Sequence, residues 1–433
     1  MNKIKFFIEP KRNEWNFLIQ RPQIGAQSLQ SLVQEVFLSV QNEGDVAIER
    51  YTHQFDGASL SNFQVSEEEI KSAFEQIPTT LKKAIEQAYE NIYTFHFSQK
   101  ERKKVIETVK GVECWRESRP IQKVGIYIPG GSAPLFSTVL MLGIPAQIAG
   151  CQEIILCSPP NKSGKIDSAI LYSAARTGIT RIYKIGGIQA IAAMSVGTET
   201  VPKVYKIFGP GNQYVTAAKK YAQEQGTAID MPAGPSEVLI IADKYAQAEF
   251  VAADLLSQAE HGTDSQVVLL TNHLPLLDKV QQHIQKQLQY LPRYAITEQA
   301  LNNSFFIYFN TLETCFEFAN EYAPEHLILN LKNYKKWIAH VHNAGSVFLG
   351  QYSCETAGDY ASGTNHTLPT AGFAKAYSGV SLDSFVKKIT FQRISKKGLL
   401  KLGTTLEVMA EHESLLAHKN AVTLRLNHTP KKS

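Results

Sequence analysis

The feature that most constrains the fold is an alternation of short apolar segments with longer, helically periodic ones, which begins near residue 121. The short segments end in Gly or Pro, and the segments that follow have about ten or more residues, as expected for helices. In order they are VGIYIPGG, PLFSTVLMLGIPAQIAG, EIILCSPP, SAILYSAARTG, RIYKIGG, IQAIAAMSVG, KVYKIFGPG and NQYVTAAKKYAQEQG. This alternation is typical of right-handed βαβ units around a parallel sheet. The sequence therefore predicts a compact α/β domain.

A second series of the same kind begins at EVLIIAD, residue 237, and predicts another α/β layer. Ahead of both series, residues 26–120 are mostly helical by their i, i+3, i+4 apolar spacing, and we expect these helices to pack on the second sheet. The tail from about residue 380 has too little apolar mass for a core of its own, so it is expected to dock elsewhere or on a partner. The sequence shows no internal repeat.

Length and composition indicate a soluble enzyme-sized protein. With 433 residues the chain is too long for one ordinary core, and 44% apolar with 19% charged residues is typical of globular proteins. No apolar run is long enough to cross a bilayer, and the first residues do not form a secretory signal, so we expect a cytoplasmic protein without a membrane partner. A net charge of +4 spread over this length does not predict nucleic-acid binding.

Two glycine-containing turns, YIPGG (127–131) and FGPGN (208–212), stand where a strand is followed by a helix. Glycine lets the backbone approach a ligand, and a helix N-terminus offers free N–H groups and a positive dipole end, which suits a phosphate. Ligands of open α/β sheets bind beyond such strand ends. The alternative is that Gly and Pro only make tight turns. The G-x-G-x-x-G fingerprint of conventional Rossmann domains is absent.

Several polar segments carry candidate site residues with a plain structural alternative. In SQAEHG, Gln258 and His261 share one helix face and could converge on a metal, although the sequence alone favours a capping role for His261. In AGPSE, Ser236 could bind a substrate or order a turn, and the turn is favoured. The loop GDYASGTNH holds Asp359 and His366 and is either a site or solvated.

The segment NEYAPEHLIL places Glu325 and His326 together between a proline and an apolar run. Pro324 disfavours helical geometry at the residue before it and so ends the preceding helix. In a regular strand the two side chains would point to opposite faces, but a bend ahead of the strand would let them serve one site. An acid/base pair is plausible by position, and a polar turn remains the alternative.

Taken together and in order, eight segments resemble the histidinol dehydrogenase family over nearly the whole chain. They are VGIYIPGGSAPLFSTVLMLGIPAQIAGC, KIFGPGNQYVT, IDMPAGPSEVLIIAD, DLLSQAEHGTDSQV, YAPEHLIL, AGSVFLG, AGDYASGTNHTLPT and AHKNAVTLR. The resemblance implies oxidation of L-histidinol through L-histidinal to L-histidine, with two NAD⁺ and one zinc ion (Zn²⁺) per active site. It implies that zinc orients the substrate by binding its imidazole and amino nitrogens.

The resemblance assigns site residues by position. The implied zinc ligands, which also contact the substrate, are Gln258, His261, Asp359 and His418. Further substrate contacts are Ser236, His326 and Glu413. The positions that match NAD contacts are Tyr127, Gln189 and Asn212. His326 resembles the family's general base for both oxidations, and Glu325 resembles the group that activates water to attack the aldehyde.

The resemblance also implies an architecture. It predicts an α/β fold of two incomplete Rossmann-like, aldehyde-dehydrogenase-like parallel-sheet domains with small N- and C-terminal helical extensions. The expected divisions are an N-terminal extension 1–25, a discontinuous zinc and catalytic domain 26–122 with 236–378, an NAD-binding domain 123–235, and a C-terminal segment 379–433. The implied assembly is a homodimer that exchanges the C-terminal segment, so that His418 and Glu413 complete the partner's site.

Aldehyde oxidation also suggests a cysteine nucleophile. The sequence has five cysteines and no C-x-x-C pair, which argues against a disulfide framework and a cysteine zinc site. Cys151 and Cys157 flank an apolar strand that would raise a thiol pKa, so they are interpreted as structural. Cys354 lies nearer the Asp359 loop, without an assigned role.

Two other functions compete with the dehydrogenase. A zinc hydrolase would use Glu325 and a metal-bound water, but it has no use for two phosphate-suited turns. A non-catalytic metal- or ligand-binding relative is the other alternative. Loss of Glu325 or His326 would have pointed to it, and both are present.

Overall fold

The structure, a computed structural model of the whole chain, describes residues 4–21, 27–60, 62–130, 134–232 and 234–428. Gly131 of the YIPGG turn and Ala233 of the AGPSE segment, together with short parts of the two terminal extensions, lie outside the described residues. The chain folds as two units. The larger unit comprises residues 1–99 and 121–385, and the smaller unit comprises residues 100–120 and 386–433.

The first sheet of the larger unit is parallel and has the strand order β6-β5-β4-β7-β8. Its strands are β4 (Lys123–Tyr127), β5 (Glu153–Ser158), β6 (Arg181–Lys184), β7 (Lys206–Phe208) and β8 (Ala228–Ile229). The connecting helices are α6 (Phe136–Ala149), α7 (Ser168–Arg176), α8 (Gly187–Val196) and α9 (Gln213–Glu224). The chain moves outward from β4 to β6 and then returns to the other side of β4. The order therefore reverses between β4 and β7, and this reversal is the switch point of the sheet.

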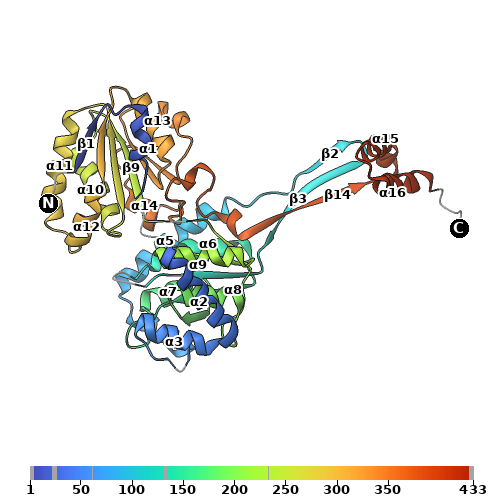
Figure 1. Cartoon of the computed structure of the whole chain (residues 1–433), viewed down its shortest axis with the longest axis horizontal. Coiled ribbons are helices and arrows are strands. Elements are labelled where there is room, and N and C mark those ends of the chain that lie inside the picture. Colours follow the sequence, from blue (N-terminus) through green and yellow to red (C-terminus); the bar gives the residue numbers. More distant parts are fainter. Residues whose placement is uncertain (1–3, 22–26, 61, 131–133, 233, 429–433) are drawn as a thin grey trace. The chain divides into compact units, whose positions relative to one another are not determined.

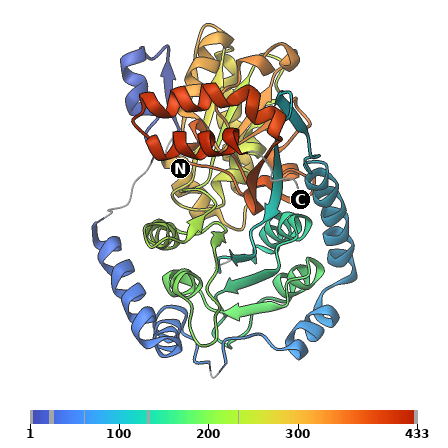
Figure 2. The same ribbon diagram turned by 90° about the vertical axis from the view of Figure 1, so that its right-hand side faces the viewer.

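Helices cover both faces of the first sheet, as Figure 2 shows from the side. Helices α6 and α7 pack on one face against Val124 and Ile126, and α8 and α9 pack on the other face near Ile155 and Ile207. Helix α6 is apolar all round and almost wholly buried, as expected for a helix that has packing partners on every side. It ends at Gly150, whose φ of 83° is the left-handed conformation of a common helix C-cap.

The second sheet is also parallel, with the order β1-β11-β10-β9-β12-β13. Its strands are β1 (Lys5–Ile8), β9 (Glu237–Ala242), β10 (Gln266–Thr271), β11 (Phe305–Tyr308), β12 (His326–Asn330) and β13 (Ser346–Leu349). Strands β9 to β13 repeat the strand order of the first sheet, with the reversal between β9 and β12. The chain therefore contains two sheets of the same topology, although its sequence shows no internal repeat.

Figure 1 shows the helices on either side of this second sheet. Helices α10 (Ala248–Ala259), α11 (Pro275–Leu288) and α12 (Tyr294–Asn302) share one core with Val238 and Ile240. On the other face, α1 (Arg12–Leu18) and α13 (Leu312–Tyr322) pack on Leu239 and Ile241. All six residues of β9 are buried, and successive side chains point to opposite faces of the sheet, which explains why the strand is apolar after Glu237. Shorter elements are α14 (Glu355–Tyr360), η1 (Tyr334–Lys336), η2 (Ile338–His340), η3 (Phe373–Lys375) and η4 (Leu382–Phe385), of which η4 packs against α6 of the first sheet.

The helices that follow the N-terminal extension do not pack where the sequence predicted. They are α2 (Gln27–Glu43), α3 (Asp45–Asp56), α4 (Glu67–Gln76) and α5 (Thr79–Phe97). Buried Val36 and Ile48 of α2 and α3 join Ile191 of α8 in one core, and α4 and α5 pack near α7 and α6. The expectation that this region packs on the second sheet is therefore wrong. Periodicity shows that a helix has an apolar face, but not which sheet that face meets.

The smaller unit contains an antiparallel sheet of order β14-β3-β2 and a pair of helices. Its elements are β2 (Val105–Val109), β3 (Val112–Pro120), β14 (Val386–Ile394), α15 (Lys396–His412) and α16 (Leu416–Asn427). The two helices meet at Gly403, where an added Cβ would lie 2.8 Å from the side chain of Leu426. Large apolar residues of the pair, including Met409 and Leu416, are exposed, as expected for a segment without a core of its own.

Across the part of the chain that the structure describes, every helix is too short or too polar to pass through a lipid bilayer.

Candidate active site

The first candidate region lies at the carboxyl ends of β4 and β7, the switch point of the first sheet. Tyr127 is the last residue of β4, and its hydroxyl accepts a hydrogen bond of 3.0 Å from the backbone N–H of Gly187. Gln189 follows in the first turn of α8, where it is fully buried and donates to Asp56 at 3.2 Å. The side-chain oxygen of Gln189 has no hydrogen-bond partner among the described residues. Tyr127 and Gln189 therefore lie together beside the N-terminus of α8.

Asn212 is the N-cap of α9, on the neighbouring strand-to-helix connection. Its side-chain oxygen accepts hydrogen bonds of 3.1 Å from the backbone N–H groups of Tyr214 and Val215. Asparagine is a preferred N-cap for this reason, and because the cap uses the side-chain oxygen, the amide N–H₂ of Asn212 is not needed for it. Because β4 and β7 are adjacent, both strand-to-helix turns lie at one edge of the sheet.

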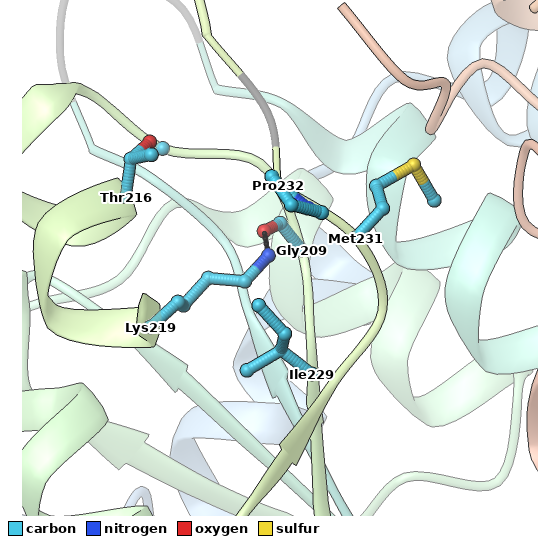
Figure 3. Close-up of a pocket in the computed structure, with 7 residues that line it drawn as sticks. Gly209, Thr216, Lys219, Ile229, Met231 and Pro232 are labelled. Atoms are coloured by element: carbon cyan, nitrogen blue, oxygen red, sulfur yellow. Dashed lines mark hydrogen bonds between the residues drawn. The ribbon is translucent and has the colours of Figure 1, made fainter. Parts of the chain in front are cut away.

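A buried ion pair between Lys219 and Asp230 holds the second turn in place, and Figure 3 shows the hydrogen bond from Lys219 to Gly209. Lys219 donates to the carbonyl of Gly209 at 2.8 Å and also pairs with Asp230, which in turn accepts from the Gly209 N–H at 2.9 Å. A Cβ at Gly209 would collide with the carbonyl oxygen of Tyr127, and its φ of 124° also requires glycine. A small recess lies here, lined by Gly209, Gly211, Thr216, Lys219, Ile229, Met231 and Pro232. The recess belongs to the nucleotide-suited turn and is separate from Glu325 and His326.

Glu325 and His326 lie at the amino end of β12, in the second sheet. The preceding helix α13 stops at Ala323, which has a left-handed φ of 52°, and Pro324 follows. This bend precedes β12, and the side chains of Glu325 and His326 lie close together where the strand begins. Their nearest polar atoms, Oε2 of Glu325 and Nδ1 of His326, are 3.6 Å apart, and both side chains are buried.

The two imidazole nitrogens of His326 have different surroundings. Nδ1 lies 3.3 Å from the backbone carbonyl oxygen of Glu237, a geometry that suits an Nδ1–H donor. Nε2 has no hydrogen-bond partner among the described residues and lies 3.5 Å from Asp359. With the proton on Nδ1, Nε2 keeps a lone pair and can accept a proton from a bound substrate.

Three acidic residues crowd His326 in this buried region. Burial would lower the pKa of His326, but the negative charge of Glu325, Glu355 and Asp359 raises it above its ordinary value. Burial raises the pKa of Glu325 and also that of Glu355. A raised pKa favours the neutral form of these two carboxyl groups, and a cation bound beside them would favour their charged forms.

The cluster has donor atoms suited to a metal. One atom each of His261, Glu355 and Asp359 lie within 4.8 Å of one another. Gln258, buried on α10, contacts this group, because one end of its amide faces Glu355 and the other end faces the backbone of Glu237, so its oxygen joins the donor set when it is turned toward Glu355. Imidazole, carboxylate and amide oxygen form a mixed N/O set compatible with zinc. One carboxylate oxygen of Glu355 is buried without a hydrogen-bond partner in the described structure, which also fits a place for a cation.

Glu355 is the residue that the sequence analysis missed. It begins α14 and lies four residues before Asp359, so both carboxylates occupy one face of the same helix. This i, i+4 spacing in CETAGDY was visible in the sequence and could have identified Glu355 as a partner of Asp359. A six-residue helix, however, is too short to be predicted from apolar periodicity.

The loop after Asp359 is anchored by His366. Its Nδ1 lies 2.8 Å from the backbone oxygen of Asp359, and its Nε2 lies 3.0 Å from the hydroxyl of Thr138 on α6. His366 thus supports the loop from the helix layer of the first sheet. Ser236 stands immediately before β9, next to the start of β12, and its carbonyl accepts from Gln266 at 3.2 Å.

Two predicted site residues belong to the smaller unit. Glu413 is the C-cap of α15, and His418 lies in the first turn of α16. Both side chains are exposed in the single chain. Within the larger unit, by contrast, the structure brings Gln258, His261 and Asp359 to one place beside the Glu325 and His326 pair.

The cysteines do not form a reactive group at the site. Burial raises the pKa of Cys151 to about 12, and it raises that of Cys157 and Cys315 further. The structural interpretation of Cys151 and Cys157 therefore agrees with their surroundings, because a thiol with a raised pKa is a poor nucleophile. Cys354 is exposed at the N-cap of α14.

Comparison with known proteins identifies the family. A family model described as histidinol dehydrogenase matches residues 19–426. The histidinol dehydrogenase of Bacteroides fragilis is 53% identical over 431 residues, covering 100% of both chains.

The chain belongs to the histidinol dehydrogenase family.

Other relatives extend the match. The chloroplastic histidinol dehydrogenase of Arabidopsis thaliana is 51% identical over 412 residues, covering 94% of this chain and 88% of that protein. The crystal structure of histidinol dehydrogenase from Elizabethkingia anophelis superposes with a TM-score of 0.97 at 58% identity, covering 98% of this chain and 99% of that one. Membership of the histidinol dehydrogenase family makes this protein an enzyme, an oxidoreductase. The predicted α/β fold with two parallel sheets is confirmed.

Proposed function

We propose that the protein oxidises L-histidinol to L-histidine in two steps, each of which reduces one NAD⁺ to NADH. In the first step the alcohol loses a hydride to NAD⁺ and a proton to a base, which gives L-histidinal. Water then adds to the aldehyde, and the hydrate loses a second hydride and a second proton, which gives the carboxylate. Membership of the histidinol dehydrogenase family supports the reaction, and the buried Glu325 and His326 pair beside the His261 and Asp359 cluster carries the residue assignment.

His326 is proposed as the general base of both oxidations. The atom that takes the proton is Nε2, which has no hydrogen-bond partner among the described residues, while Nδ1 faces the Glu237 carbonyl. Glu325 is proposed to activate the water that attacks the aldehyde. Its raised pKa, caused by burial, makes its carboxylate a stronger base than an exposed one. The hydrate again carries a hydroxyl, so one imidazole can serve both hydride transfers.

The proposed zinc ligands in the larger unit are Gln258, His261 and Asp359. The mixed donor set and the buried Glu355 carboxylate oxygen that has no hydrogen-bond partner among the described residues support a cation here. When bound, Zn²⁺ would orient the substrate through its nitrogen atoms and offset the charge of the carboxylates. The position of Ser236 at the same strand edge suits a further contact to the substrate.

The NAD⁺ contacts are proposed to come from Tyr127, Gln189 and Asn212. Their place at the switch point of the first sheet, beside two helix N-termini, supports binding of a dinucleotide with its phosphates. Bound NAD⁺ accepts the hydride. We accordingly assign residues 123–235 to cofactor binding and residues 236–378 to zinc and catalysis. The expected extension of the catalytic domain to residues 26–122 is not kept, because helices α2 to α5 pack with the helices of the first sheet.

The remaining substrate and zinc contacts are proposed to come from a second copy of the chain. Glu413 and His418 are exposed in the smaller unit, as are apolar residues of the same helix pair, which suits their burial in a homodimer. A cytoplasmic location is proposed as well. The hydrolase and the non-catalytic binding protein, raised as alternatives from the sequence, are disfavoured because the family is one of oxidoreductases.

The test is the amount of NADH formed per L-histidinol consumed by the purified, zinc-loaded protein. Two equivalents, with histidine as the product, are expected. One equivalent would mean that the aldehyde escapes or that water activation fails, and no NADH would contradict the proposal. Removal of zinc with a chelator should abolish turnover while circular dichroism shows an intact fold, and full activity of demonstrably metal-free protein would refute the metal's role.

A further inference from the structure

The peptide group of Glu237 lies between the two residues proposed to do the chemistry. Its N–H donates to Oε2 of Glu325 at 2.9 Å, and its carbonyl oxygen faces Nδ1 of His326 at 3.3 Å. Glu237 begins β9, the strand next to β12, so the two contacts follow from the pairing of these strands. One backbone unit therefore orients both side chains.

The side chain of Glu237 binds the same segment from the other side. Its Oε1 faces the backbone N–H of Glu325 at 3.3 Å and accepts from that of Ala371 at 3.1 Å. The side chain is almost fully buried, with 1% of its surface exposed. A carboxylate in such a place needs a counter-charge, since burial of an unpaired charge is costly.

Arg21 supplies that counter-charge from the N-terminal extension. Its guanidinium makes two hydrogen bonds to the Glu237 carboxylate, at 2.7 Å and 3.0 Å. It also donates at 2.7 Å to the carbonyls of Ile19 and Tyr322 and lies 3.5 Å above the Tyr322 ring. Planar, bidentate pairing and ring stacking are both specific to arginine, and lysine reproduces neither.

We propose that Arg21 is a positioning residue of the active site, which acts through Glu237 on Glu325 and His326. This inference rests on the proposed function. The Arg21 and Glu237 pair fixes the start of β9, and the Glu237 peptide then holds the proton of His326 on Nδ1 and the Glu325 carboxylate in its orientation. The N-terminal extension is thus part of the catalytic machinery, although its residue touches no substrate.

The decisive variant is Arg21→Met, which keeps the length of the side chain and removes its charge and donors. We expect kcat with L-histidinol to fall on the order of 10- to 100-fold, as for displaced supporting groups in other sites. The KM for NAD⁺ should stay unchanged, because the first sheet is not altered. The primary isotope effect on kcat, measured with histidinol deuterated at the carbinol carbon, should rise as hydride transfer becomes slower.

The isotope effect separates positioning from a loss of folded protein. A merely structural role would lower the active fraction and leave the isotope effect at the wild-type value, which would overturn the proposal. Arg21→Lys should retain only part of the wild-type activity, since the lysine ammonium cannot make the bidentate pair with the Glu237 carboxylate. If Arg21→Met does not fold, the double variant Arg21→Met with Glu237→Gln removes the unpaired charge and should still show low kcat and a raised isotope effect.

A matched control lies in the same N-terminal segment. Arg12 pairs with Glu317 at 2.7 Å, but both side chains are more than half exposed, so Arg12→Met should leave kcat and the isotope effect unchanged. Equal loss in Arg12→Met and Arg21→Met would overturn the inference. A wild-type protein that fails to oxidise histidinol would refute the proposed function itself. An active wild type with a fully active, folded Arg21→Met variant would refute only the role of Arg21.

Discussion

Strands β9 to β13 of the second sheet have the strand order of the first sheet, yet the two candidate sites lie at opposite ends of the strands. In the first sheet Tyr127 and Asn212 stand at the carboxyl ends of strands, where helices begin. In the second sheet His326 stands at the amino end of a strand, and Gln258 and His261 stand where α10 ends. Helix N-termini carry partial positive charge and helix C-termini partial negative charge. In this topology the carboxyl ends of the strands, where helices begin, suit phosphates. The amino ends, where helices end, suit a cation.

The comparison predicts that changes in the second sheet affect the chemical steps, and the largest effect should come from His326→Asn. Asparagine has no nitrogen able to accept a proton, so the general base is lost. We expect NADH formation from both histidinol and histidinal to fall by about 10²- to 10⁴-fold, the usual contribution of a general base. Stopped-flow or steady-state absorbance of NADH measures both. Loss with only one of the two substrates would contradict a single base.

A change in the first sheet should instead affect stability and cofactor affinity, and Lys219→Met is the strongest case. It leaves Asp230 buried without its partner, which costs about 3 to 5 kcal/mol of unfolding free energy. Denaturant unfolding measures this loss, and Lys219→Met with Asp230→Asn should recover much of it. The KM for NAD⁺ should rise because the FGPGN turn loosens.

The control for this variant is Lys220→Met, one residue along the same helix. Lys220 is exposed, so its replacement should change the unfolding free energy by less than about 0.5 kcal/mol. The folded Lys219→Met variant, saturated with NAD⁺, should form as much NADH per histidinol as the wild type. A changed ratio would contradict the proposal that the first sheet binds the cofactor and the second sheet carries out the chemical steps.

Glu325→Gln should separate the two oxidations. Glutamine keeps the shape and the contact with the Glu237 N–H but cannot take a proton from water, so the aldehyde step should slow by about 100-fold, as for a lost general base. Histidinol should then yield close to one NADH, with histidinal accumulating. The aldehyde can be trapped with a hydrazine reagent during turnover. Equal slowing of both steps would contradict a separate role for Glu325.

Much of the fold followed from the sequence because strand and helix periodicities are local. The alternations that begin near residues 121 and 237 predicted the two α/β layers, and the end of α13 before Pro324 follows from the restriction that proline places on Ala323. The predicted packing of α2 and α3 was wrong because an apolar helix face does not show which sheet it packs against. The strand β14 was also hidden, since an exposed strand in an antiparallel pair lacks an apolar run.

Less of the candidate site could be predicted from the sequence, because its residues are far apart in the sequence and meet only in the fold. The spacing of Gln258 and His261 gave one helix face, yet nothing local joined them to Asp359, and the family resemblance made that link. Arg21 and Glu237 are 216 residues apart in sequence and meet only in the folded chain. Glu355 was within reach through its i, i+4 relation to Asp359.

The smallest expected effect comes from replacing the helix cap Asn212. Its variants distinguish a role in helix stability from a role in NAD⁺ binding. Asn212→Ala should lose about 1 kcal/mol of stability, the usual value of an N-cap, whereas Asn212→Ser keeps a capping oxygen and should lose much less. Both variants lack the amide N–H₂, so both should raise the KM for NAD⁺. Thr311→Ala removes the cap of α13, beside the second sheet, and should cost similar stability without changing that KM. If Asn212→Ser binds NAD⁺ as the wild type does, Asn212 only caps its helix, and the side-chain contacts to the cofactor come from Tyr127 and Gln189 without it.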